Sequence, residues 1–157
     1  MPLFKKDAAS HSSRAPSVTR EAVDASRAGF LHALDEEIWR ARRYGRPLSI
    51  FIAGPRLLPA ERLSSGEVEF ASRTVGDVLR RSDASVWLQE SFIAGILPET
   101  NADQARAAAY RLRGELERRT VSARRRNWRV ATVPLGDEES AEILLDALFA
   151  RYSEDVD

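Results

Sequence analysis

The chain has 157 residues, 43% of them hydrophobic and 31% charged, which is typical of one globular domain that buries about 70% of its unfolded surface. Lysine plus arginine and aspartate plus glutamate each total 24, so no net field favours nucleic acid or an anionic membrane. The absence of cysteine excludes disulfides, thiolate catalysis and cysteine-based metal sites, and the two histidines, His11 and His32, lie in a predicted tail and on a predicted helix.

Residues 1–18 have no sustained hydrophobic period and few large apolar side chains, so we expect a flexible N-terminal tail ahead of one domain over residues 19–157. No apolar run approaches the ~20 residues of a membrane span. Lys5 and Lys6 precede no hydrophobic region, which argues against a secretory signal. We therefore expect no membrane span and a location in the cytoplasm.

Hydrophobic periods predict the order helix, strand, helix, two strands, helix, strand, helix. A helix is predicted over 19–44, ended by Gly45 and Pro47, and a strand over 49–53. A helical stripe over 68–79 leads into a hairpin with a polar turn at 89–91, and a second helical stripe covers 105–116. A strand over 128–133 is followed by a last helix whose first turn holds Asp137, Glu138 and Glu139. This order predicts an α+β palm with a central, mostly antiparallel sheet flanked by helices.

The hairpin carries a family resemblance. Arg80 and Asp83 form an R-x-x-D, and Leu97, Pro98 and Thr100 form an L-P-x-T fourteen residues after Asp83. Laid on without gaps, these residues resemble the two ends of the GGDEF (diguanylate cyclase) signature, R-x-x-D, five residues, G-G-[D/E]-E-F, then a strand ending L-P-x-T. Residues 41–48 are similar to the family's junction A-R-R-x-G-x-P-L, and residues 147–149 to its closing A-L-Y, so the resemblance covers about residues 19–152.

The resemblance implies an enzyme that condenses two GTP molecules into cyclic di-GMP with two divalent ions, but the central motif is missing. Its five positions read Gln89, Glu90, Ser91, Phe92 and Ile93, in place of G-G-[D/E]-E-F. The family's first metal acid, at the end of the first strand, falls on Gly54, and its other falls on Ser91. Phosphoryl transfer depends on positioned metal ions, so we predict a catalytically inactive domain with no catalytic residue, no bound metal and no cofactor.

Two further positions depart from the family. The Asn that contacts guanine falls on Ser26, and the Lys after the first strand falls on Pro59. A register shifted by one residue reads 88–92 as the signature, with Glu90 as a metal acid and Phe92 as the final Phe. We rank that register lower because it breaks the spacing to Asp83 and Pro98 and leaves Gly54 without a carboxylate.

The family's R-x-x-D belongs to an inhibitory product site, where its Arg and Asp, with a second Arg on the next helix, clamp cyclic di-GMP. That second position falls on Arg111. The resemblance therefore implies a cyclic di-GMP receptor at Arg80, Asp83 and Arg111, with a homodimer formed when the ligand links two protomers. The alternative is a ligand-independent protein-interaction or dimerisation module of a bacterial signalling or scaffold assembly, in which Arg80 and Asp83 are a solvated helix-end pair.

Aromatic and basic residues elsewhere have simpler interpretations. Basic residues 124–126 beside Trp128 resemble a nucleic-acid contact, but in an electrically balanced chain we expect a solvated loop with Trp128 in the core. We expect Trp39 to be half-buried, and for Trp87 core packing and a partner interface stay equally open. A protein partner is expected, and nucleic acid is not.

Overall fold

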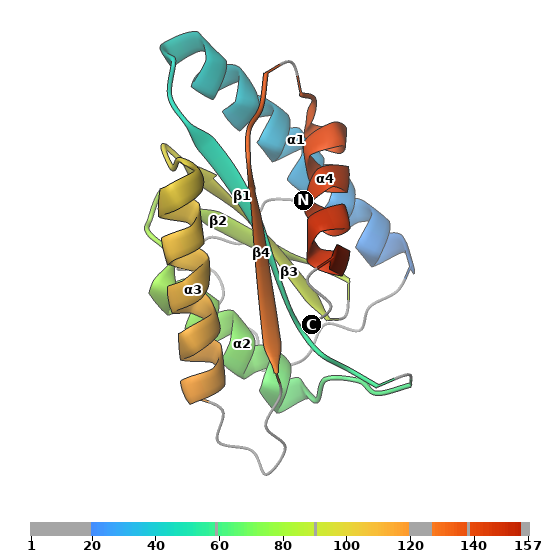
Figure 1. Ribbon diagram of the computed structural model, residues 1–157. Helices are drawn as coiled ribbons and strands as arrows, with labels where there is room; N and C mark the ends of the chain where they lie inside the picture. Colours follow the sequence, from blue (N-terminus) through green and yellow to red (C-terminus); the bar gives the residue numbers. More distant parts are fainter. Residues whose placement is uncertain (1–19, 59, 90, 120–126, 138, 155–157) are drawn as a thin grey trace.

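A computed structural model describes residues 20–58, 60–89, 91–119, 127–137 and 139–154 (Figure 1). The elements, in chain order, are α1 (Arg20–Tyr44), β1 (Leu48–Pro55), α2 (Ser65–Val78), β2 (Ala84–Gln89), β3 (Phe92–Pro98), α3 (Ala102–Arg118), β4 (Trp128–Pro134) and α4 (Ala141–Glu154). Four strands form one sheet in the order β2-β3-β1-β4, and every neighbouring pair is antiparallel. The predicted α+β fold is therefore confirmed. None of the described helices is long and apolar enough to span a membrane.

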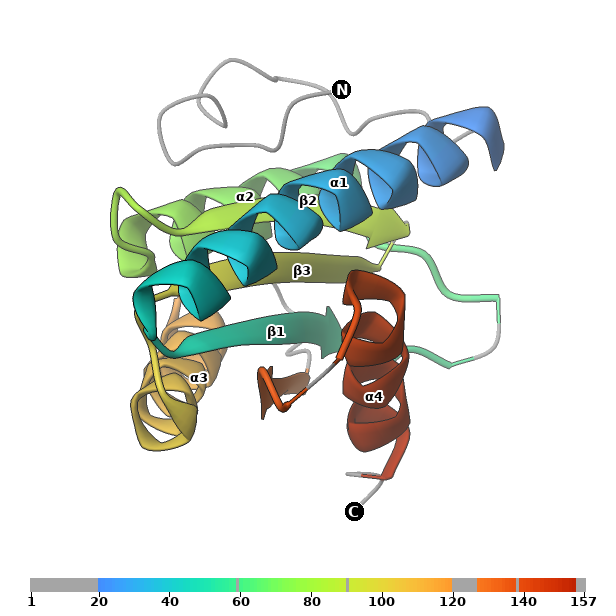
Figure 2. The same cartoon turned by 90° about the horizontal axis from the view of Figure 1, so that it is seen from above.

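The sheet separates two apolar layers, each covered by a pair of helices, and Figure 2 shows the arrangement of these helices and strands from above. Helices α1 and α4 cover one face through residues such as Phe30, Leu34 and Leu148, which are fully buried. Helices α2 and α3 cover the other face through residues such as Val75 and Leu116. Every residue of β1 is buried, because this strand is paired on both edges and covered on both faces. That burial explains the unbroken apolar run seen in the sequence.

The predicted hairpin is present, with β2 and β3 joined by a tight turn. Val86 pairs with Ala94 and Trp87 with Ile93, and the register then shifts so that Gln89 pairs with Phe92. The indole of Trp87 is half-buried and donates to the Ser72 hydroxyl at 2.9 Å, so this side chain joins β2 to α2. Trp128 is 3% exposed, and its predicted place in the core is confirmed. Residues 124–126 and the expected tail lie outside the described residues.

Two sequence-based expectations need correction. The last helix does not begin at residues 137–139 but at Ala141, where the Ser140 hydroxyl accepts from the Ile143 amide. The Glu139 carboxylate accepts a hydrogen bond from the Gly136 amide at 2.7 Å, so it stabilises the turn before α4 and not the first turn of the helix. Glu138 lies outside the described residues. Trp39 is 59% exposed instead of half-buried, because it lies about 100° around α1 from buried Ile38. Gly45 adopts a φ of 62°, as expected for a helix-ending glycine.

Two glycines of the chain should respond oppositely to alanine. A Cβ on Gly95 in β3 would lie 2.1 Å from the Phe51 ring and 2.8 Å from the Ala84 carbonyl oxygen, whereas a Cβ on Gly114 in α3 meets nothing within 4 Å. Gly95→Ala should therefore lower the free energy of unfolding by roughly 1–3 kcal/mol through overpacking. Gly114→Ala should raise it by about 0.5–1 kcal/mol through helix propensity. Urea denaturation followed by circular dichroism measures both changes, and a neutral Gly95→Ala would contradict the packing described for β1 and β3.

Candidate functional site

The position of the family's first metal acid is closed by the chain's own side chains. Gly54 lies near the end of β1, opposite Arg129 of β4. A Cβ added there would lie 2.6 Å from the Tyr152 hydroxyl, 2.9 Å from the Phe92 ring and 2.9 Å from the Ser91 carbonyl oxygen. All three distances are shorter than real Cβ atoms tolerate, so the present packing admits only glycine at this position.

An aromatic cluster fills the space over Gly54. The Phe92 ring packs edge-on against Tyr152 at 5.4 Å between ring centroids and against Phe149 at 6.1 Å, each at 88°. The Arg129 guanidinium lies 4.7 Å above the Tyr152 ring and donates to the Tyr152 carbonyl at 3.4 Å. Burial raises the pKa of the Tyr152 hydroxyl, and the nearby Arg129 charge opposes that rise. The space over Gly54 is therefore filled by aromatic rings, with the Arg129 guanidinium stacked on one of them.

Of the five motif positions, Ser91 and Phe92 contribute to this cluster, whereas Gln89 and Ile93 lie apart from it. Gln89 is exposed at the end of β2, Ser91 and Phe92 are half-buried, and Ile93 is buried in the opposite layer, with α2 and α3. Glu90 lies outside the described residues, as does Pro59. Ser26, at the family's guanine-contacting position, is half-buried on α1.

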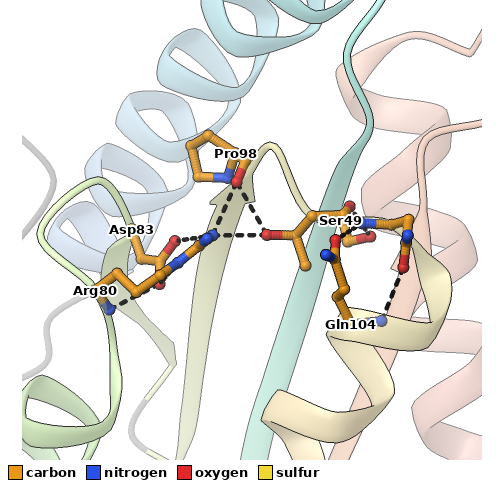
Figure 3. Close-up of polar contacts among 7 residues, drawn as sticks. Ser49, Arg80, Asp83, Pro98 and Gln104 are labelled. Carbon is orange, nitrogen blue, oxygen red and sulfur yellow. Dashed lines mark hydrogen bonds and ion pairs between the residues drawn. The ribbon is translucent and has the colours of Figure 1, made fainter.

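Arg80 and Asp83 do lie together, as a compact clamp at the end of α2 (Figure 3). Asp83 is 4% exposed, and its carboxylate accepts from Arg80 Nε at 3.3 Å, from Nη2 at 3.1 Å and from the Arg80 amide at 2.8 Å. A buried carboxylate costs free energy unless it is paired in this way. The pair is therefore an integral part of the fold, not a solvated helix-end pair.

The same guanidinium reaches the end of β3. Arg80 Nη2 contacts the Pro98 carbonyl oxygen at 2.9 Å and the Thr100 hydroxyl at 2.7 Å, and the Thr100 carbonyl accepts from the Ser49 hydroxyl of β1 at 2.9 Å. Arg80 thus ties the α2–β2 loop to the start of α3. The Arg80 side chain remains 53% exposed, and its Nη1 makes no hydrogen bond within the described part of the chain. One edge of the guanidinium fork consequently faces solvent in a fixed orientation.

Arg111 lies on the exposed surface of α3. It shares an i, i+4, i+8 stripe with Glu115 and Arg119, and Arg119 pairs with Asp77 of α2 at 2.8 Å between Nη1 and Oδ2. Two contacts join the ends of α3 to α2 and the loop that follows it. Arg80 bonds Thr100 just before α3, and Asp77 of α2 bonds Arg119 just after α3. Arg111 lies along the helix between these two contacts. Arg111 is exposed and about 14 Å along the helix from Ala102. No ion pair in the described chain engages it.

A hollow of about 530 Å³ adjoins the clamp. It is lined by Ser82 of the R-x-x-D, by Pro98 at the end of β3 and Glu99 after it, by Tyr44 at the end of α1, and by Arg46 in the turn that follows α1. Arg46 pairs with Glu99 across it, and Arg40 pairs with Glu37 on its rim. The surface beside Arg80 and Asp83 is therefore concave and carries both charges.

Comparison with solved structures identifies this architecture. The GGDEF domain of DgcB from Caulobacter crescentus, in complex with c-di-GMP, matches with a TM-score of 0.73 and 13% identity over 82% of each chain. Diguanylate cyclase SiaD from Pseudomonas aeruginosa, in complex with its activator SiaC, matches with a TM-score of 0.69 and 17% identity over 79% of this chain and 52% of that chain. The active GGEEF domain of a diguanylate cyclase from Vibrio cholerae matches with a TM-score of 0.67 and 14% identity over 79% and 86%.

No protein-family model and no curated protein matches the sequence. The fold is nevertheless that of GGDEF domains, and the resemblance read from Arg80, Asp83, Pro98 and Thr100 is confirmed at that level. At identities of 13%, 17% and 14%, these similarities establish the fold of the chain.

The clamp makes a stability prediction. Arg80→Ala leaves Asp83 buried without its ion pair, so we expect the free energy of unfolding to fall by roughly 2–4 kcal/mol. Arg81→Ala, at the exposed neighbouring position, should change it by less than about 0.5 kcal/mol. Urea unfolding of the two variants beside the parent chain gives the comparison. Equal stability of both variants would show that the clamp has no structural role.

Proposed function

We propose that this protein is a catalytically inactive GGDEF-like domain that acts as a cyclic di-GMP receptor through Arg80, Asp83 and Arg111. The observation that carries the inactive assignment is the packing over Gly54, where Phe92, Tyr152 and the Ser91 carbonyl occupy the volume a metal-binding carboxylate needs. Without oriented divalent ions, phosphoryl transfer loses its main source of charge stabilisation.

The receptor assignment rests on the geometry of the clamp. Asp83 and Thr100 hold the Arg80 guanidinium so that its free edge is fixed, and Arg111 of α3 supplies a second exposed guanidinium. Planar guanidinium forks match phosphate and guanine edges, which cyclic di-GMP presents twice. The DgcB domain, with a similar fold, was solved in complex with c-di-GMP. We expect the protein in the cytoplasm, with a change of partner or of dimer geometry as its output.

A second candidate function is a ligand-independent protein-interaction module. It is favoured by the internal use of Arg80, whose Nη2 is fully engaged by Asp83, Pro98 and Thr100, and by exposed aromatic residues such as Trp39 and Tyr110. SiaD, with a similar fold, was solved in complex with its activator SiaC. Calorimetry separates the two functions, because only the receptor releases or absorbs heat with cyclic di-GMP.

Cyclic di-GMP should bind the intact chain in isothermal titration calorimetry, and Arg111→Ala should weaken binding by about tenfold or more. Arg111 is the informative position because it is exposed and outside the clamp, so its loss leaves the fold intact. Arg113→Ala is the matched control, because Arg113 is an exposed arginine two residues further along α3 and therefore points to another side of the helix. Arg80→Ala should abolish binding, judged only at a temperature where it is folded.

If calorimetry detects no heat of binding at high micromolar cyclic di-GMP, the receptor function is contradicted and the interaction module is favoured. Light scattering with and without ligand tests the linked dimer. A rise from one to two protomers supports ligand bridging, and an unchanged mass contradicts it.

The chain should form no cyclic di-GMP from GTP with magnesium or manganese, and Gly54→Asp should not restore synthesis. The new carboxylate would collide with Phe92 and Tyr152, so this variant should also lose roughly 2–4 kcal/mol of unfolding free energy. Product measured by chromatography, with an active cyclase as positive control, decides the question. Sustained synthesis by the parent chain would overturn the inactive assignment.

A further inference from the structure

Helix α1 presents an unusual stripe on the face away from the sheet. Its inner face is buried through Phe30, Leu34, Ile38 and Ala41. On the outer side, Asp35, Trp39 and Arg43 follow one another at i, i+4 and i+8, so they lie along one line of the helix. Trp39 at the centre is 59% exposed, and both flanking charges are exposed. We refer to these three residues as the α1 stripe.

The two charges of the α1 stripe have no ionic partner within the described residues. The Arg43 guanidinium lies 5.3 Å from the centroid of the Trp39 ring and 5.8 Å from that of Tyr44, without a carboxylate beside it. Asp35 has neither a hydrogen bond nor an ion pair in the same part of the chain. Neighbouring arginines differ, since Arg40 pairs with Glu37 at 2.6 Å and Arg46 pairs with Glu99. Each copy thus exposes one unpaired acid and one unpaired base at equal distances from an exposed indole.

We propose that the α1 stripe is a two-fold interface between two copies of this chain, with the two α1 helices antiparallel and Trp39 at the symmetry axis. A two-fold interface is self-complementary, so that residue i meets residue j and j meets i. Asp35 and Arg43 are each four residues, or about 6 Å along the helix, from Trp39. Antiparallel pairing therefore brings Asp35 of each copy to the partner's Arg43, and two ion pairs form around a central aromatic contact.

The surface beside Trp39 accommodates the second indole. A hollow of about 610 Å³ lies between α1 and the residues that precede α4, lined by Ile38, Trp39, Arg42, Glu139 and Ser140 as well as by the stripe charges. Arg42 donates to the Glu139 carbonyl at 2.6 Å and holds its far wall in place. Tryptophan, tyrosine and arginine are the residues that most often carry interface energy.

A second copy fits this surface better than an acidic or a basic partner. The α1 stripe is neutral overall and changes sign along its length, so a partner of one sign would meet a like charge at one end. A single helix pair buries less than the ~1,200 Å² of a standard interface, so the dimer is expected to be weak and salt-sensitive. None of the three residues of the α1 stripe contacts Arg80, Asp83 or Arg111 within the described chain, so the dimer needs no ligand at those residues in order to form.

Charge reversal tests the interface. Sedimentation equilibrium of the full chain, from micromolar to millimolar protein at low salt, should show a monomer–dimer equilibrium that high salt weakens. Asp35→Arg and Arg43→Asp should each raise the dimer dissociation constant by about tenfold or more, because every dimer contains two like-charged contacts. Arg73→Asp, on α2 in the other layer, should leave it unchanged. Circular dichroism checks that each variant is folded.

The decisive measurement mixes the two single variants. Neither should form homodimers well, but a one-to-one mixture should form heterodimers, since Asp35→Arg in one copy then faces Arg43→Asp in the other. The double variant Asp35→Arg/Arg43→Asp should recover the parent dissociation constant. A parent chain that is monomeric at every concentration, a dimer insensitive to both reversals, or a mixture that stays monomeric would each overturn the proposal.

Discussion

The packing of Phe92 and Tyr152 against Gly54 is the constraint on which the rest of the site depends. β1 is buried on both faces, so any side chain at its end must fit between α4 and the β2–β3 turn. Two aromatic rings already fill that gap, and interiors as dense as this tolerate no added carbon without displacement. A single glycine therefore links the sheet, the hairpin and the last helix into one arrangement that leaves no room for a larger side chain at this position.

The opposite end of the hairpin has kept its polar chemistry. There, Arg80 bonds the buried Asp83, the Pro98 carbonyl at the end of β3 and the Thr100 hydroxyl just before α3. A residue whose charge is needed for folding persists even where no ligand binds, so the R-x-x-D by itself does not distinguish recognition from architecture. Arg111 does, because it contributes nothing to the clamp and lies on the exposed side of α3.

Residues close together in the sequence were predicted well. The hairpin and the order of elements both follow from short spacings and local periods. Tyr152 and Arg129 were missed because they reach Gly54 from α4 and β4, which only the folded chain brings beside β1. Tyr152 follows Phe149 at i+3 on the buried side of α4, and that spacing was the available signal. The expectation that Trp39 is half-buried was wrong, although its position one residue after the core residue Ile38 already indicated that it points away from the sheet.

The aromatic filling over Gly54 also bears on how such a chain can change over evolutionary time. Placing a carboxylate at Gly54 requires removing two large rings first, and each removal opens a void in the apolar layer that costs roughly 3–5 kcal/mol. Introducing the acid first creates a collision instead. Both orders pass through poorly folded intermediates, so single substitutions cannot easily exchange the aromatic filling over Gly54 for an acidic side chain, whereas the outer surfaces of the domain remain free to vary.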